Sequence, residues 1–126
     1  MYSILAICAG ASAGALFPWL LGLQLNAMSS TIPLGTLAAN LLGGFFIGMA
    51  LNFFSTQAAV ATEWRLIVIT GFLGGFTTFS TFSAEVVTLL QQRRFALAIG
   101  AVSIHMLGSL LMTILGMLTL GWIRNV

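Results

Sequence analysis

Apolar positions fill four long stretches of this chain, and short polar segments separate them. No charged residue occurs within residues 2–25, 32–54, 66–84 or 95–123. Crossing a bilayer as a helix takes about 20 mostly apolar residues. The first stretch has no basic residue before it and is too long for a cleaved signal, so we interpret it as a retained helix. The pattern predicts an all-α membrane protein with four transmembrane helices per subunit, joined at 26–31, 55–63 and 91–94.

Composition supports a membrane location and excludes several functions. Hydrophobic residues make up 60% of the 126 positions and charged residues only 5%, whereas soluble domains carry about 25% charged residues. We therefore expect residues 1–126 to form one four-helix transmembrane domain. The single cysteine, Cys8, allows no internal disulfide and gives no metal-ligand spacing. The four arginines form no basic cluster, so no nucleic acid partner is expected.

The arginines divide evenly between the two sides of the membrane. With four spans, Arg65 and Arg124 fall on one side, and Arg93 and Arg94 fall on the other. The excess of Lys and Arg near helix ends normally sets orientation. An even count predicts either a chance tie in a protein of few charges or insertion in both orientations, followed by assembly of an antiparallel, dual-topology homodimer.

Three pairs of glycines four residues apart allow close helix packing. They are Gly10 with Gly14, Gly44 with Gly48, and Gly71 with Gly75. Such a pair places two small residues on one helix face, where another backbone can approach. The spacing indicates packing either within one subunit or between two.

Polar side chains within the second and fourth spans form two stripes. Thr36 and Asn40 lie four residues apart, and His105, Ser109 and Thr113 repeat the same spacing. Single serines and threonines in membrane helices often bond their own backbone. The Asn40 amide cannot be satisfied by its own helix at both ends, so it must pair across helices, or meet water or an ion. His105 is interpreted as a buried, hydrogen-bonded histidine more readily than as a pathway residue.

The third span contains a weak helix. Gly74 and Gly75 precede a run of hydroxyl side chains that begins at Thr77, and both features loosen helical hydrogen bonding. We therefore expect the helix to break near the middle of the membrane. Freed carbonyl groups at that depth need protein, water or a bound cation, and oxygen ligands of this kind suit sodium.

Aromatic rings and one carboxylate follow the expected break. Phe76, Phe79 and Phe82 recur every three residues, and Glu85 follows. Packing is the ordinary explanation of such an aromatic stripe. The alternative depends on the positive edge of the ring, which can contact an anion without a fixed charge. Glu85 is solvated if it lies at a helix end, and needs a donor or a proton if it lies deeper.

Three segments together resemble the Fluc (CrcB) family of small bacterial fluoride channels. They read GTLAAN at 35–40, GFLGGFTTFSTFSAE at 71–85 and GSLLMT at 108–113. The resemblance covers the whole chain. It implies a multi-pass protein of the bacterial cytoplasmic (inner) membrane that works as a dual-topology homodimer with two antiparallel pores. Cytoplasmic fluoride would leave passively through these pores, which would reduce its toxicity.

The resemblance also implies roles for particular residues. Asn40 and Ser109 would donate hydrogen bonds along the anion pathway, and Phe79 and Phe82 would supply ring edges. Backbone carbonyls of Gly74 and Thr77 from both subunits would hold a central structural sodium ion. The remaining positions that match the pathway are Thr36, Thr113 and Glu85.

One position departs from the family pattern. Pro18 precedes Trp19 where family members usually carry an arginine, so this chain lacks any help that such a charge gives to anion entry. Proline also removes a backbone donor from the first helix. The departure affects the expected conduction rate rather than the selectivity.

Other functions fit the sequence less well. A dual-topology, proton-coupled multidrug exporter shares the size and charge balance, but it needs a carboxylate in the first helix, where this chain has none. A purely structural protein leaves Asn40 and the glycine break unexplained. An enzyme is not expected, because no nucleophile, base and orienting group occur together.

Overall fold

The computed structural model describes residues 2–28, 33–57, 60 and 62–125, and all the regular structure in these ranges is helical. In chain order the elements are α1 (Tyr2–Leu25), η1 (Asn26–Met28), α2 (Leu34–Thr56), α3 (Thr62–Arg65), the π-helical η2 (Leu66–Leu73), α4 (Gly74–Phe76), α5 (Phe79–Gln91) and α6 (Phe95–Asn125). Four helical segments are long and apolar enough to cross a membrane: Tyr2–Met28, Leu34–Thr56, Thr62–Gln91 and Phe95–Asn125. The prediction of an all-α protein with four such segments is confirmed.

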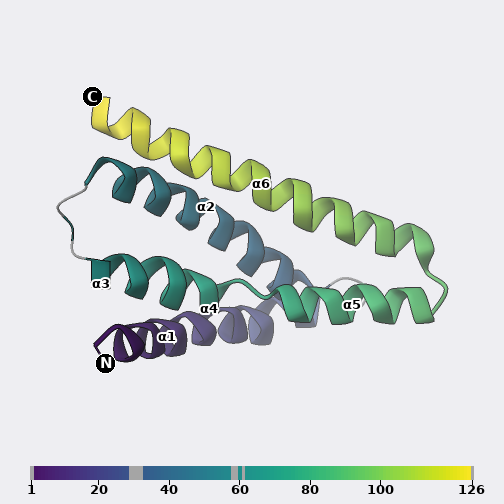
Figure 1. Ribbon diagram of the computed structural model, residues 1–126. Coiled ribbons are helices and arrows are strands. Elements are labelled where there is room, and N and C mark those ends of the chain that lie inside the picture. The colour runs from purple at the N-terminus through teal and green to yellow at the C-terminus, as the bar shows by residue number, and fades with distance from the viewer. Residues whose placement is uncertain (1, 29–32, 58–59, 61, 126) are drawn as a thin grey trace.

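The segments form an elongated bundle in which α1 begins and α6 ends at one pole (Figure 1). Helix α2 ends and α3 begins at that same pole, and the turn between α5 and α6 lies at the other. Helix α2 packs along α6, and α1 packs against η2 and α4. Helices α5 and α6 converge towards their shared turn.

The third segment is longer than the sequence pattern predicted. We expected a span over 66–84, but the segment runs from Thr62 to Gln91 with one interruption. The boundary was wrong because we ended the span at the nearest charge. Glu63 and Arg65 lie in the first turns of the segment, and Glu85 lies inside α5, where a neighbouring hydroxyl binds it.

Two residues interrupt the helical geometry of this segment. Thr77 is extended, with φ −86° and ψ 136°, and Thr78 has φ −120° and ψ 74°. Helix resumes at Phe79. The interruption follows the glycine pair and begins the hydroxyl run, where the intrinsic preference for helix is weakest.

The glycine pairs pack helices within the subunit. A Cβ added at Gly75 would lie 2.7 Å from the carbonyl oxygen of Ala11 in α1. One added at Gly44 would lie 2.8 Å from the carbonyl oxygen of Ser109 in α6. Real Cβ atoms do not approach so closely, so the missing side chains allow α4 to lie against α1 and α2 against α6.

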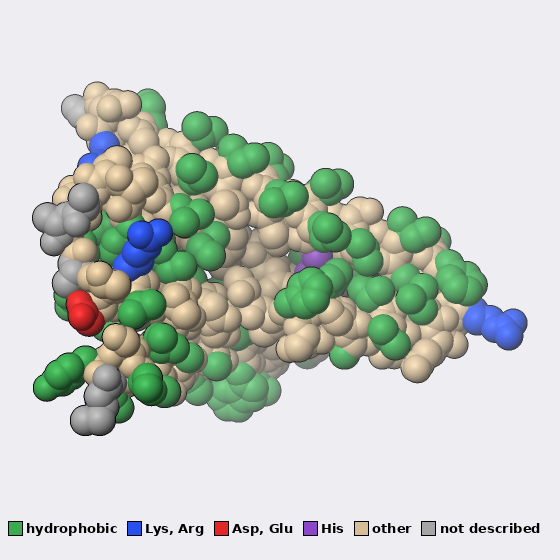
Figure 2. Space-filling view, viewed as in Figure 1, with side chains coloured by type: hydrophobic (Ala, Val, Ile, Leu, Met, Phe, Trp, Pro, Cys, Tyr) green, Lys and Arg blue, Asp and Glu red, His purple; other side chains and the backbone are tan. Residues whose placement is uncertain are grey.

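The lateral surface of the molecule is largely apolar. Figure 2 shows hydrophobic side chains along the length of the visible face, with arginines towards its two ends. Many large hydrophobic side chains are more than half exposed, including Leu107 of α6 at 67%. Such a surface is suited to lipid or to another membrane protein. Near the pole with the chain ends, Asn52 donates to the Met117 carbonyl oxygen at 2.9 Å and ties α2 to α6.

Candidate functional site

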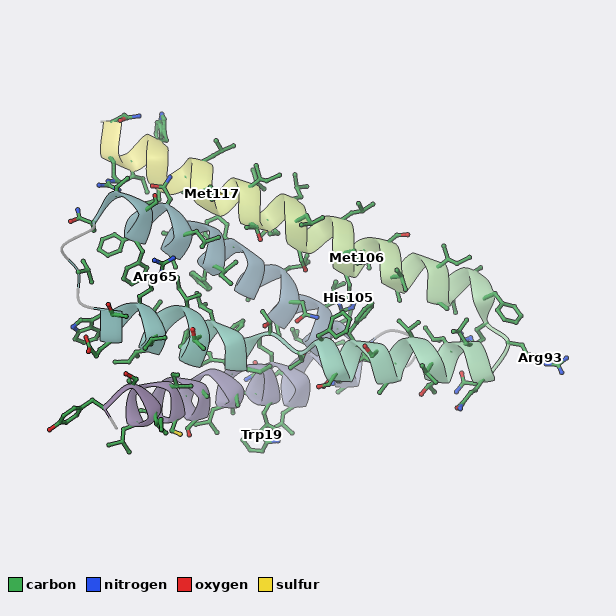
Figure 3. The ribbon with its side chains drawn as sticks, viewed as in Figure 1. Trp19, Arg65, Arg93, His105, Met106 and Met117 are labelled. Carbon is green, nitrogen blue, oxygen red and sulfur yellow. The ribbon has the colours of Figure 1, made fainter. Side chains whose placement is uncertain are left out.

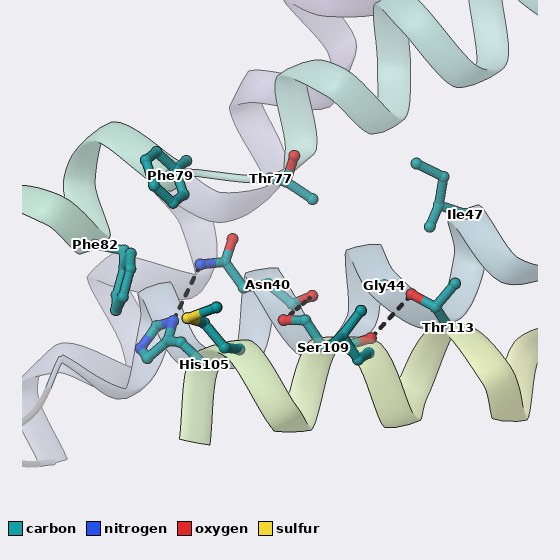
Figure 4. Close-up of a pocket in the computed structure, with 11 residues that line it drawn as sticks. Asn40, Gly44, Ile47, Thr77, Phe79, Phe82, His105, Ser109 and Thr113 are labelled. Atoms are coloured by element: carbon teal, nitrogen blue, oxygen red, sulfur yellow. Dashed lines mark hydrogen bonds between the residues drawn. The ribbon is translucent and has the colours of Figure 1, made fainter. Parts of the chain in front are cut away.

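A cavity of about 410 Å³ lies where α2, α5 and α6 meet the interruption of the third segment. It opens between apolar helices and is lined by both polar and aromatic groups (Figure 4). Its lining comprises Asn40, Gly44, Ile47, Thr77, Phe79, Phe82, His105, Met106, Ser109, Leu110 and Thr113. Among the described residues, no carboxylate and no arginine belongs to this lining.

Asn40 links three parts of the subunit at this cavity. Its Oδ1 accepts a hydrogen bond from the backbone N–H of Thr78 at 2.9 Å, inside the interruption. Its Nδ2 lies 3.1 Å from Nδ1 of His105 in α6. Because a backbone N–H can only donate, the Thr78 contact fixes which end of the amide is oxygen. Asn40 therefore donates to His105, as expected for an amide that its own helix cannot satisfy.

The same contact fixes the protonation of His105. A ring nitrogen that accepts a hydrogen bond carries no proton, so Nδ1 is bare and the neutral imidazole holds its proton on Nε2. His105 is only 4% exposed, and its Nε2 has no hydrogen-bond partner among the described residues. The prediction of a buried, hydrogen-bonded histidine is confirmed, and Figure 4 shows the imidazole between Asn40 and Phe82.

Aromatic contacts position the two phenylalanines after the interruption. The ring of Phe82 stacks on the imidazole of His105 with a centroid distance of 4.6 Å and an interplanar angle of 29°. Phe79 lies beside Phe82 at 5.7 Å and 56°. Phe82 is buried, whereas Phe79 is 75% exposed. The stacking sets the plane of the Phe82 ring, while Phe79 is largely uncovered in the described structure.

The hydroxyl groups of α6 continue the polar lining away from His105. The Ser109 hydroxyl reaches the backbone carbonyl oxygen of Asn40 at 3.5 Å, which is a long contact across the α2 and α6 interface. The Thr113 hydroxyl donates to the Ser109 carbonyl oxygen of its own helix at 2.9 Å. Thr113 thus makes the backbone bond that is common for threonine in membrane helices.

Thr36 and Glu85 pair with each other beside this cavity. The Thr36 hydroxyl donates to Oε1 of Glu85 at 2.5 Å, joining α2 to α5. Thr36 is buried and Glu85 is half-buried. Glu85 is therefore not solvated at a helix end. The donor that a deeper carboxylate requires is the hydroxyl of Thr36.

A second cavity of about 450 Å³ lies on the α1 side of this pair. It is lined by Ala15, Pro18, Trp19, Gly22, Leu23, Asn26, Thr36, Thr78 and Thr81. Thr77 lines the first cavity and Thr78 the second, so the interruption separates the two. The hydroxyl of Thr78 is buried and has no partner within the described part of the chain.

Comparison with known proteins identifies the family. The family model described as CrcB-like protein, Camphor Resistance (CrcB), matches residues 5–117. The chain belongs to the CrcB family. A protein named fluoride-specific ion channel FluC from Tolumonas auensis is 60% identical over 99% of this chain and 98% of its own length. A protein of the same name from Pseudomonas aeruginosa is 58% identical over 95% of this chain and 94% of its own length. Another from Chromobacterium violaceum is 54% identical over 98% of this chain and 98% of its own length.

Most of the pathway residues that the CrcB resemblance implied come together in space. Asn40, Phe79, Phe82, Ser109 and Thr113 line the first cavity. Thr36 and Glu85 lie outside it as a bonded pair, and of the two only Thr36 lines the second cavity.

The two groups that bind Asn40 were not assigned to the site from the sequence. The four-residue spacing from Ser109 already placed His105 on the polar stripe, but its contact with Phe82 is not visible in that spacing. Nothing in the sequence indicated that the backbone of Thr78 would bind Asn40.

Proposed function

We propose that this chain forms a fluoride-selective channel through which cytoplasmic fluoride leaves a bacterial cell passively, across the cytoplasmic membrane. The cavity lining carries the proposal, because it brings hydrogen-bond donors and aromatic rings together with no charged side chain. The names of the relatives support it. A channel is not an enzyme, and no chemical step is required of these residues.

Fluoride holds its hydration water tightly, so a pathway must replace that water with several donors. The Asn40 amide and the Ser109 hydroxyl are the donors that we assign to the lining of the first cavity. Ring edges of Phe79 and Phe82 add partial positive charge without a fixed cation. Weak sites in series suit conduction, because an ion must leave as easily as it enters.

In this proposal the second cavity is the entrance, and an ion must cross the interruption to reach the first cavity. Thr36 and Thr78 line the second cavity next to the interruption, and the Thr78 hydroxyl is an unpaired donor within the described structure. Pro18 lines the same cavity, so the departure from the family pattern falls at this entrance. The uncharged entrance of this chain attracts anions less strongly than one that carries an arginine, and we expect slower entry rather than altered selectivity.

An antiparallel homodimer completes the pathway in our proposal. The exposed ring of Phe79 and the exposed Thr77 lie inside a membrane-spanning segment, where polar and pathway groups need cover from protein. A second copy provides that cover. The even division of the arginines supports insertion in both orientations.

We also propose a structural sodium ion at the interruption. In a continuous helix the Thr78 N–H would bond the Gly74 carbonyl, but it donates to Asn40 instead. At the start of α5 the Phe82 N–H donates to the Thr78 carbonyl, so the Thr77 carbonyl precedes the helical ladder. Carbonyls of Gly74 and Thr77 from two subunits would hold sodium, whose charge would stabilise the contact between the two interruptions.

Fluoride efflux from liposomes that contain the purified chain tests the proposed function. We expect fluoride release, measured with a selective electrode, and no release of chloride under the same gradient. Phe82→Ile removes the ring edge and Phe82→Tyr retains it. If the Phe82→Ile variant folds and conducts fluoride at the parent rate, the ring-edge mechanism is excluded. If the parent protein releases chloride as fast as fluoride, the proposed selectivity is wrong.

A further inference from the structure

A shallow groove of about 230 Å³ runs between α5 and α6, away from both cavities of the pathway. Its lining is almost wholly apolar and consists of Val86, Leu90, Ala98, Ile99, Val102 and Ser103. Ile99 is 68% exposed and Leu90 is 43% exposed, whereas Ala98 forms part of the buried contact between the helices. The groove therefore has a small-residue floor with exposed aliphatic walls.

Two consecutive arginines lie at the outer end of this groove. Arg93 N–H donates to the carbonyl oxygen of Leu90, and Ala98 N–H donates to the carbonyl oxygen of Arg94, each at 3.0 Å. Leu90 and Ala98 are groove residues, so both arginines are one turn or less from its end. Figure 3 shows the Arg93 side chain at the tip of the molecule, directed away from the bundle. Neither arginine forms an ion pair with a carboxylate in the described ranges.

The backbone at Arg93 has a conformation that is unusual for a residue with a side chain. Its φ of 58° is the left-handed conformation, and the bonds from Arg93 to Leu90 and from Arg94 to Leu89 close the end of α5 as a Schellman motif. Glycine is favoured at this position, and a residue with a Cβ is disfavoured there. The chain nevertheless carries an arginine in place of the residue that would suit the turn better.

We infer that this groove and its two arginines bind an anionic phospholipid. The phosphate group pairs with Arg93 and Arg94 at the level of the headgroups, and one acyl chain follows the groove past Leu90 towards Val102. Arginine pairs planar donors with phosphate oxygens, and basic groups beside grooves between membrane helices are suited to anionic headgroups. The site is separate from the ion pathway, so lipid binding can be measured without measuring conduction.

Native mass spectrometry of the purified full chain with added phosphatidylglycerol or phosphatidylcholine tests the inference. We expect tighter retention of phosphatidylglycerol. Each arginine near an anionic headgroup contributes about fivefold in affinity, so the Arg93→Gln, Arg94→Gln double variant should bind phosphatidylglycerol about 25-fold more weakly. The Arg65→Gln, Arg124→Gln double variant removes the same charge at the other pole and should leave this binding unchanged.

A second pair of variants tests the groove itself. Ile99→Trp fills the groove and should weaken binding of both lipids, whereas Ile104→Trp places the same bulk elsewhere on α6 and should not. Phosphatidylglycerol retained equally by the Arg93→Gln, Arg94→Gln variant would overturn the inference. So would a water-soluble glycerophosphoglycerol headgroup that binds as tightly as the lipid, because the groove would then contribute nothing. If Ile99→Trp dissociates a dimer and leaves lipid binding unchanged, the face is an interface between copies and not a lipid site.

Discussion

Replacing Asn40 by alanine is the most direct test of the site, because one side chain joins three elements there. The change removes the hydrogen bond to the Thr78 N–H and the bond to Nδ1 of His105. Hydrogen bonds between membrane helices average about 0.6 kcal/mol and reach about 1.7 kcal/mol. Losing two should lower the free energy of unfolding by about 1–3 kcal/mol.

The effect on fluoride flux should be larger than the effect on stability. A hydrogen bond to a charged group contributes about 1.5–3 kcal/mol, which corresponds to about 10- to 150-fold in an equilibrium or rate. The variant also frees the imidazole of His105, on which the Phe82 ring stacks. We expect Asn40→Ala to reduce fluoride efflux from liposomes by at least about tenfold.

Asn52 provides the matched control. It is also an asparagine of α2 that donates to α6, through its bond to the Met117 carbonyl oxygen, but it lies outside both cavities. Asn52→Ala should cost about 0.6 kcal/mol and leave efflux unchanged. Thermal unfolding in detergent and fluoride efflux are measured for both variants. If Asn40→Ala folds and still conducts at the rate of Asn52→Ala, the amide is not part of the fluoride pathway.

Three further predictions concern packing, topology and the cation. Gly44→Ala should lower the unfolding temperature, because the added Cβ meets the Ser109 carbonyl. Gly100→Ala should not, because open space surrounds Gly100. Equal shifts in the two variants would contradict the packing assignment. Adding three lysines at the carboxyl end should fix one orientation in the membrane and abolish fluoride efflux. Efflux should return when an oppositely biased copy is supplied. Full efflux through the biased protein alone would refute dual topology. Replacing sodium by a large organic cation should lower dimer stability. Gly75→Leu should lower dimer stability more than Thr77→Val does. The reverse order would exclude backbone carbonyl ligands.

The sequence by itself determined the number of membrane segments and much of their extent. Hydrophobic length is a local property, and lipid offers no hydrogen bonds, so an apolar stretch of sufficient length must form a helix. The bounds of α1 matched the expected 2–25, and α6 began at Phe95 as expected. The four-residue spacing also placed Asn40 and the α6 stripe on helix faces, because that spacing repeats about once per turn.

Only the tertiary structure decided which of these faces meet. Thr36 and Asn40 share one face of α2, yet Thr36 binds Glu85 of α5 and Asn40 binds His105 of α6. Glycine spacing allowed contacts within or between subunits, and the fold assigned Gly44 to α6 and Gly75 to α1. Partners in these cases are 49 to 65 residues apart along the chain. Helical periodicity fixes a direction around one axis, and the partner in that direction depends on how the axes pack.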